Sequence, residues 1–263
     1  MLGPYDCNDE KTLLTHFRWA EKAGIDVFIC SWWGINSFED KVFRKMLNIA
    51  EDHDLKVKLT IYYETLGLAE NVGKVCRELA YIVKEYGGSR AFLKLNNTPV
   101  VFIYAVESRD VSFWEAVLKG LWREDIKVIL IADTTKKAYA KIFHGIHIYN
   151  PLPLLLADKS GDTLRTTYKR MADIAKKYNC IFVATVMPGY DDRIIRKPGL
   201  FLEREGGRIY NMTWEIAIES GAEWIVVTSW NEWHEGTEIE PSVEYGFQYL
   251  NMTARWVEEF KKS

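Results

Sequence analysis

Two glutamates three residues apart, Glu232 and Glu235, are the side chains of this sequence whose type and spacing best suit acid–base chemistry. Breaking a glycosidic bond needs two carboxyl groups held close together in environments that separate their pKa values. Both glutamates follow an apolar run that begins at Trp224, and the indoles of Trp230 and Trp233 flank them. Indoles offer flat apolar faces to the C–H side of a sugar ring. The segment therefore indicates a site that acts on carbohydrate.

The residues beside the two glutamates suggest further roles. Trp233 and His234 are predicted to contact the substrate, and no second histidine follows at the spacing of a zinc motif, so no metal is expected. Asn231 either orients the first glutamate or a sugar hydroxyl, or it caps the loop. Glu238 and Glu240 lie farther along and are predicted to be surface carboxylates, which is the usual situation of Glu.

Strands and helices must position the two glutamates and their neighbours. Short apolar runs without polar alternation predict strands that are buried on both faces. Helical patterns lie between them, such as the stripe of Leu13, Phe17 and Ala20, and a last helix is predicted over Tyr245–Lys261. The predicted strands are Val27–Trp33, Val57–Tyr63, Val100–Tyr104, Val128–Ala132, Gly145–Tyr149, Ile181–Val186 and Trp224–Ser229.

Strict alternation of strands and helices predicts right-handed βαβ units and a parallel sheet. No Gly-x-Gly-x-x-Gly turn follows any of the strands, which disfavours an open dinucleotide-binding sheet. Polar and aromatic residues gather just after the strands, and that edge carries the active site in a (β/α)8 barrel. We therefore predict an α/β fold of the TIM-barrel type, with residues 1–263 forming one catalytic domain.

The predicted strand Ile181–Val186 is followed by a loop with three candidate residues. Tyr190 is expected to line the site, with core packing as the alternative. Asp192 and Arg196 are expected to form an ion pair that fixes the loop, and a direct contact of either residue with a sugar hydroxyl is an open alternative.

Aromatic residues end two other predicted strands. Of Trp32 and Trp33, one is expected to stack on sugar while the other packs inward, because adjacent strand residues face opposite ways. Tyr149 is a further candidate for substrate binding.

The composition narrows the class of protein. Of 263 residues, 48% are apolar, which is ample for a large core, and the net charge of -3 argues against nucleic acid as a partner. No apolar run reaches the ~18 residues of a membrane span, and the first residues lack the pattern of a signal peptide. As written, the chain reads as cytoplasmic, and no cofactor is expected.

Three segments, in order along the chain, resemble glycoside hydrolase family 99, the endo-α-1,2-mannosidases and related endomannanases. The strongest is Thr228–Glu240, with the run Trp-Asn-Glu-Trp-His-Glu-Gly-Thr-Glu. Leu2–Asp6 with Ala23–Gly34, and Pro188–Arg196, are the other two, so the likeness spans Leu2 to Phe260. The resemblance implies a (β/α)8 barrel that cleaves internal α-mannosidic linkages of an oligosaccharide or polysaccharide with retention of configuration and without a metal.

The resemblance also implies roles for individual residues. Glu232 matches the carboxylate that acts as base toward the substrate's own 2-hydroxyl, and Glu235 matches the general acid. Tyr190 matches a tyrosine of the reacting-sugar subsite, and Trp32 matches an indole of the adjoining subsite.

The sequence departs from the family pattern at three places. Tyr62 occupies the place of a family carboxylate, which Glu64 could replace only from a shifted position, and Ala105 occupies the place of an aspartate. The family's first strand is missing. A similar motif after the last strand occurs in WbsX-type proteins of surface-polysaccharide gene clusters, so a glycosyltransferase or an inactive carbohydrate-binding protein is the alternative function.

The missing first strand has three explanations. The start codon is assigned too late, the barrel is open with seven strands, or a partner covers the gap, since an open sheet edge exposes backbone groups. A lost N-terminal segment is the favoured explanation, and if that segment carried a signal sequence the protein would be secreted. The sequence leaves the oligomeric state open.

Overall fold

The computed structural model describes residues 1–262, and the chain divides into two compact units. The N-terminal unit is Pro4–Ile146. The C-terminal unit runs from His147 onward and includes Met1–Gly3, whose terminal amino group donates a 2.9 Å hydrogen bond to the carbonyl of Pro241. The C-terminal unit contains the two glutamates of interest.

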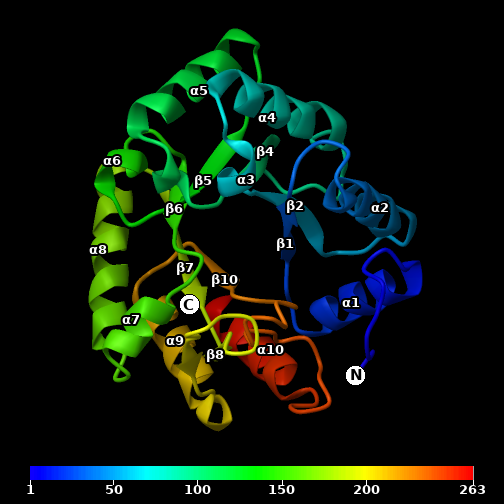
Figure 1. Cartoon of the computed structure of the whole chain (residues 1–263), viewed down its shortest axis with the longest axis vertical. Coiled ribbons are helices and arrows are strands. Elements are labelled where there is room, and N and C mark those ends of the chain that lie inside the picture. Colours follow the sequence, from blue (N-terminus) through cyan, green and yellow to red (C-terminus); the bar gives the residue numbers. More distant parts are fainter. Residues whose placement is uncertain (263) are drawn as a thin grey trace. The chain divides into compact units, whose positions relative to one another are not determined.

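The N-terminal unit alternates strands and helices (Figure 1, blue to green). Its helices are α1 (Glu10–Lys22), α2 (Phe38–Asp52), α3 (Thr65–Leu68), α4 (Val72–Tyr86), η1 (Val106–Ser108), α5 (Val111–Arg123) and α6 (Lys137–Ala140). Its strands are β1 (Val27–Trp32), β2 (Lys58–Tyr63), β3 (Lys94–Leu95), β4 (Thr98–Ile103) and β5 (Ile129–Asp133), and β6 (Gly145–His147) begins in this unit.

Four strands of this unit, β1, β2, β4 and β5, are neighbours in a parallel sheet in chain order. Their register aligns Trp32 with Tyr63, Tyr63 with Ile103, and Ile103 with Ala132. The carboxyl ends of the strands therefore meet at one edge. Helices α4 and α5 lie side by side against this sheet (Figure 1). The first helix is capped by Asp9, whose carboxylate accepts a 2.8 Å hydrogen bond from the amide of Thr12.

The C-terminal unit (Figure 1, green to red) carries the remaining elements. Its helices are α7 (Leu152–Ala157), α8 (Asp162–Tyr178), η2 (Glu205–Gly207), α9 (Arg208–Glu219) and α10 (Gln248–Phe260). Its strands are β7 (Ile181–Val186), β8 (Tyr190–Asp191), β9 (Phe201–Leu202) and β10 (Trp224–Val227). Strands β7 and β10 pair in parallel with Val186 opposite Val227, and α8 and α9 pack against β7. The short antiparallel pair of β8 and β9 closes the loop that follows β7.

All seven predicted strands are present, as β1, β2, β4, β5, β6, β7 and β10. The differences lie at their ends: β10 stops at Val227, where the chain turns, and β6 stops at His147 rather than Tyr149. In the described residues no strand precedes α1, as the sequence indicated. None of the helices within residues 1–262 combines the length and the apolar composition that a bilayer crossing needs.

Candidate active site

Glu235 is the centre of a hydrogen-bonded cluster in the C-terminal unit. Its Oε2 accepts a 3.1 Å hydrogen bond from the hydroxyl of Tyr149, and its Oε1 accepts a 3.3 Å hydrogen bond from the hydroxyl of Tyr190. Both terminal nitrogens of Arg196 lie 3.4 Å from the same Oε1. Only 15% of the Glu235 side chain is exposed, so these donors fix the direction of its carboxylate.

Asp192 organises the donors that reach Glu235. Its Oδ2 accepts hydrogen bonds of 2.6 Å from Arg196 and 3.0 Å from the hydroxyl of Tyr190, while Oδ1 accepts one of 2.6 Å from the amide of Leu200. The bond from Arg196 holds the pKa of Asp192 below its ordinary value. The predicted ion pair between Asp192 and Arg196 is confirmed, and it fixes the loop between β8 and β9.

Tyr190 lies between the carboxylates of Asp192 and Glu235, and only 4% of its surface is exposed. Its single proton can serve Asp192 or Glu235 but not both at once, and its oxygen accepts a 2.8 Å hydrogen bond from Arg196. Burial and the charge of Glu235 raise the pKa of Tyr190, so its hydroxyl stays protonated.

Glu232 has a more open setting. Its side chain is 46% exposed, and its Oε1 lies 3.8 Å from Nδ1 of His234. Its amide donates a 2.9 Å hydrogen bond to Oγ of Ser229. Burial, and next the charge of Glu235, raise the pKa of Glu232 above its ordinary value. The two glutamates therefore interact electrostatically while their hydrogen-bond partners differ.

A compact turn carries both glutamates. The amide of Glu235 donates to the carbonyl of Glu232 (3.2 Å), and the carbonyl of Glu235 accepts a 2.7 Å hydrogen bond from the amide of Asp191 in β8. Gly236 follows with φ +59°, and a Cβ there would lie only 3.1 Å from the Asp191 amide nitrogen. A glycine at this position lets the turn lie directly on β8.

The other predicted residues of this loop are exposed. The Trp233 residue is 42% exposed, and the His234 side chain is 75% exposed. Asn231 accepts a 2.9 Å hydrogen bond from the amide of Trp233 through its backbone carbonyl. Contacts of these three residues with a substrate remain predictions.

Trp32, Trp33 and Tyr62 belong to the N-terminal unit. The two indoles face opposite ways, as expected: Trp33 is 50% exposed and Trp32 is fully buried. Trp32 donates a 2.8 Å hydrogen bond from Nε1 to Asp40 and stacks on Tyr63, so in this structure it offers no face to a sugar. The expectation for Trp32 is corrected: its flanking helix and strand enclose it. Tyr62 is also buried, with its ring edge-on to another tyrosine.

Glu238 and Glu240 correct another expectation, because they are buried at 6% and 3% exposure rather than being surface carboxylates. Oε1 of Glu238 lies 2.8 Å from Nη2 of Arg204, which is equally buried. Burial raises the pKa of Glu238, while the charge of Arg204 opposes this rise. Arg204 was not predicted from the sequence, since no local pattern links it to a carboxylate far along the chain.

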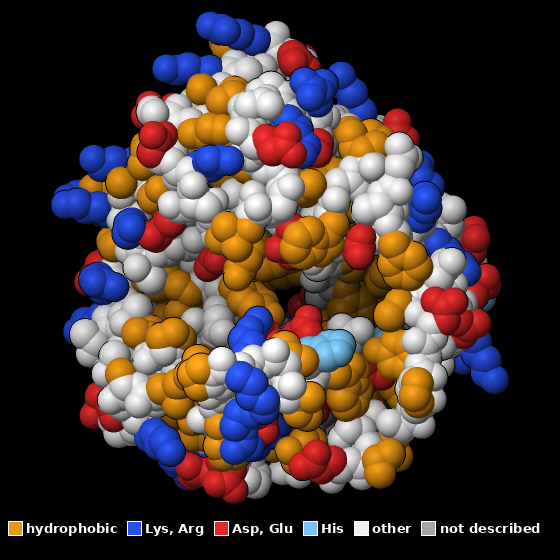
Figure 2. Space-filling model, in the orientation of Figure 1, with side chains coloured by type: hydrophobic (Ala, Val, Ile, Leu, Met, Phe, Trp, Pro, Cys, Tyr) orange, Lys and Arg blue, Asp and Glu red, His pale blue; other side chains and the backbone are white. Residues whose placement is uncertain are grey.

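The surface of the C-terminal unit reflects this arrangement. Figure 2 shows basic side chains gathered over the loop between β8 and β9, with acidic side chains beside them. The ion pair of Arg193 with Asp191 and that of Arg196 with Asp192 belong to this loop. Within residues 1–262 no group of three or more His, Cys, Asp or Glu side chains is arranged to hold a metal ion.

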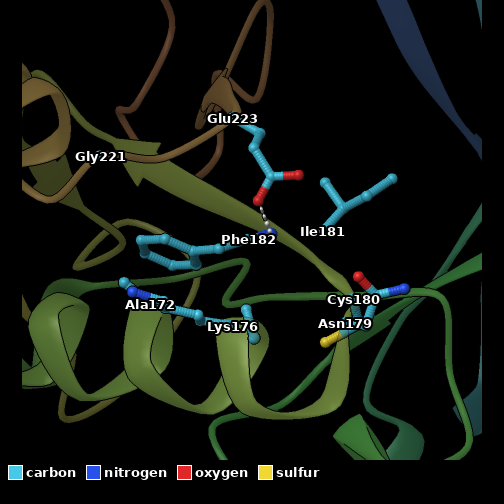
Figure 3. A pocket seen from close by; sticks show the side chains of 9 residues that line it. Ala172, Lys176, Asn179, Cys180, Ile181, Phe182, Gly221 and Glu223 are labelled. Atoms are coloured by element: carbon cyan, nitrogen blue, oxygen red, sulfur yellow. Dashed lines mark hydrogen bonds between the residues drawn. The ribbon is translucent and has the colours of Figure 1, made fainter.

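A hollow of about 500 Å³ lies at the other end of β7, where this strand begins (Figure 3). Figure 3 shows Glu223 pointing to Phe182, whose amide donates a 3.2 Å hydrogen bond to this carboxylate. Lys176 and Cys180 also line the hollow. Among its lining residues Glu223 is the one carboxylate, so the hollow lacks the acid pair that glycoside cleavage needs.

Comparison with known proteins places the chain among carbohydrate-active barrels. The model of glycosyl hydrolase family 99 matches residues 1–262. The glycoprotein endo-alpha-1,2-mannosidase of Mus musculus is 24% identical over 99% of this chain, and an endo-alpha-1,2-mannosidase-like protein of Danio rerio is also 24% identical. The chain spans 63% and 66% of the lengths of these two relatives.

A solved structure is similar over nearly the whole chain. The family 99 endo-alpha-mannosidase of Bacteroides thetaiotaomicron superposes with a TM-score of 0.87 and 28% identity, covering 99% of this chain and 83% of that one. The fold class is therefore the (β/α)8 barrel, here without a strand ahead of α1 in the described residues. The fold, with acidic groups after its last strand, defines the class of glycoside hydrolase barrels. The chain belongs to glycosyl hydrolase family 99.

Proposed function

We propose that this chain is the catalytic barrel of an endo-acting glycoside hydrolase that cleaves internal α-mannosidic linkages with retention of configuration. The observation that carries the proposal is the pair Glu232 and Glu235, which share one turn and have different hydrogen-bond partners, while the charge of Glu235 raises the pKa of Glu232. The names of the family relatives, endo-alpha-1,2-mannosidases, support mannosides as the substrate class.

In the proposed first step, Glu232 accepts the proton of the substrate's 2-hydroxyl, and the freed oxygen attacks the anomeric carbon. The bond to the leaving oxygen breaks as Glu235 gives it a proton. The intermediate is a 1,2-anhydro sugar. In the second step Glu235 takes a proton from water, which attacks the anomeric carbon, and Glu232 returns its proton to the 2-oxygen. Two inversions give net retention.

Each of the two carboxyl groups has one feature that suits its proposed role. A base works best when its pKa is close to the working pH, and burial raises the pKa of Glu232 in that direction. Glu235 must approach one particular oxygen, and the hydrogen bonds from Tyr149 and Tyr190 hold its carboxyl group in a defined direction. Arg196 and Asp192 support this direction through Tyr190.

The proposal predicts that Glu235→Gln and Glu232→Gln each lower the turnover of reducing-end-labelled manno-oligosaccharides by about 100- to 10,000-fold, because each removes a proton-transfer group. Products are separated by chromatography, and the anomer formed first is identified by NMR. Glu215→Gln, an exposed glutamate of α9, is the matched control and should keep wild-type turnover.

Three results would contradict the proposal. Full activity of Glu235→Gln would remove this residue from the chemistry. Binding of the oligosaccharides without any product from the wild-type protein would indicate a carbohydrate-binding protein. Elongated products from an activated sugar donor would indicate the glycosyltransferase alternative.

A further inference from the structure

Arg204 is a buried cation that contacts the chain beside Glu235 and the chain beside Tyr190. It lies between β9 and η2 and is 7% exposed, as is typical only of charged groups that are paired. Its partner Glu238 is 6% exposed, and the ion pair spans 2.8 Å. A buried pair of this kind contributes little net stability, because both ions lose their hydration. Stability alone therefore does not account for the buried pair.

The guanidinium group holds the backbone of the turn that carries Glu235. Nη2 of Arg204 donates a 3.0 Å hydrogen bond to the carbonyl of Gly236, the residue directly after Glu235. The amide of Asp191 binds the carbonyl of Glu235 itself. Two neighbouring carbonyls are thus held by donors from the segment that includes β8 and β9.

The stem of the same side chain lies against the residue before Tyr190. A Cβ on Gly189 would meet Cγ of Arg204 at 2.5 Å and Cα at 3.3 Å, so the backbone at Gly189 passes directly along this arginine. One residue therefore contacts the chain next to Glu235 and the chain next to Tyr190.

Two aromatic rings lie against the guanidinium. The ring centroids of Tyr245 and Tyr249 lie 4.3 and 4.5 Å from Cζ of Arg204, and the two rings meet edge to face at 5.2 Å. A cation that lies against two aromatic rings and is bound by a carboxylate has little freedom to move. Its hydrogen bond to Gly236 therefore has a fixed direction.

We propose that Arg204 is a positioning residue that sets the placement of the Glu235 carboxyl group relative to Tyr190. The inference rests on the proposed function, because it assigns Arg204 to the same reaction. Arg204 does not contact the carboxylate of Glu235. It acts through the backbone of Gly236, which follows Glu235, and of Gly189, which precedes Tyr190.

The test uses the double variant Arg204→Met/Glu238→Gln, which removes the cation without leaving a buried charge unpaired, and the single variant Arg204→Lys, which keeps the positive charge opposite Glu238. Arg208→Met/Glu205→Gln is the matched control, since it removes a neighbouring ion pair with a half-exposed arginine. Each folded variant is measured for kcat, for KM and for hydrogen exchange of the Asp191 amide.

We expect kcat of the double variant to fall about 100-fold while KM changes less than about threefold, because a misplaced proton donor affects the chemical step. Arg204→Lys should give an intermediate kcat, because an ammonium lacks the planar fork of donors. The Asp191 amide should exchange faster in the double variant, since its acceptor is the carbonyl of Glu235. The control should match the wild-type protein in all three measurements.

A lower melting temperature with unchanged kcat and unchanged Asp191 exchange would overturn the inference, because Arg204 would then only stabilise the fold. If the wild-type protein hydrolyses none of the mannosides, the proposed function fails, and the exchange measurement decides on Arg204 alone. Faster exchange of Asp191 then supports the positioning role, and unchanged exchange overturns it.

Discussion

Glu232 and Glu235 differ in what surrounds them although they are three residues apart. Two phenols and a guanidinium approach the carboxylate of Glu235, whereas that of Glu232 is half exposed with His234 nearby. At this scale, the residue types and their spacing were enough to select the pair from the sequence. Tyr149 and Tyr190 were also named as candidates to line the site, and Arg196 as the ion-pair partner of Asp192, but their hydrogen bonds to Glu235 were not predicted.

The raised pKa of Glu232 leads to a prediction about pH. A base works only in its unprotonated form, so kcat/KM should fall as the pH drops through the pKa of Glu232. Because burial and Glu235 raise that pKa, the midpoint of the acidic limb should lie above the ordinary value of 4.5. The measurement is kcat/KM for a labelled manno-oligosaccharide across the acidic range. A midpoint at or below 4.5 would contradict it.

His234 supplies a check on this assignment. The interaction with His234 lowers the pKa of Glu232, so His234→Gln should move the acidic limb to higher pH. His53→Gln, at the exposed end of α2, should leave the limb in place. If the limb stays unchanged in His234→Gln, another group controls it.

At the scale of elements, Asp40 of α2 ties its helix to β1 and α4. It is 2% exposed and accepts hydrogen bonds from Nε1 of Trp32 and from the hydroxyls of Tyr81 and Tyr86. Burial alone would raise the pKa of Asp40, but the hydrogen bonds, with that of Tyr86 the strongest, hold it below the ordinary value. The carboxylate thus fixes Trp32 inside the N-terminal unit.

Asp40→Asn should lower the free energy of unfolding by about 1–3 kcal/mol, because an amide nitrogen would face donors that now bind oxygen. Urea denaturation measures the change. Asp52→Asn, exposed at the end of the same helix, is the control and should stay within about 0.5 kcal/mol of the wild-type protein. Equal midpoints for both variants would show that the hydrogen bonds of Asp40 add no net stability.

The burial of Trp32 and of Glu238 could not be predicted from the sequence, because each depends on a partner outside its own element. Burial of Trp32 depends on Asp40, a residue of the next helix, and burial of Glu238 depends on Arg204, which lies before α9. Neither pairing leaves a periodic signal in the sequence, because the partners meet only after the strands and helices have packed. Alternation along β1 predicted that one of the two indoles packs inward, but it could not decide which one.

For the whole chain, apolar runs and their alternation with helices were sufficient to predict seven of the strands and the barrel class, whereas the two-residue strands β3, β8 and β9 were not predicted. Periodicity identifies an element better than its ends, which depend on local turns such as the one after Val227. Membership of glycosyl hydrolase family 99 extends over residues 1–262 and agrees with this fold. That residues 1–263 form a single catalytic domain stays a prediction.

Glu232 and Glu235 are joined by a hydrogen bond within their own turn rather than by separate strands. If the surrounding sheet moves slowly, the backbones of Glu232 and Glu235 move together, because both residues lie in one turn. The relative position of the two residues' backbones is thus set within the turn itself. Substitutions in distant loops would leave that local arrangement unchanged.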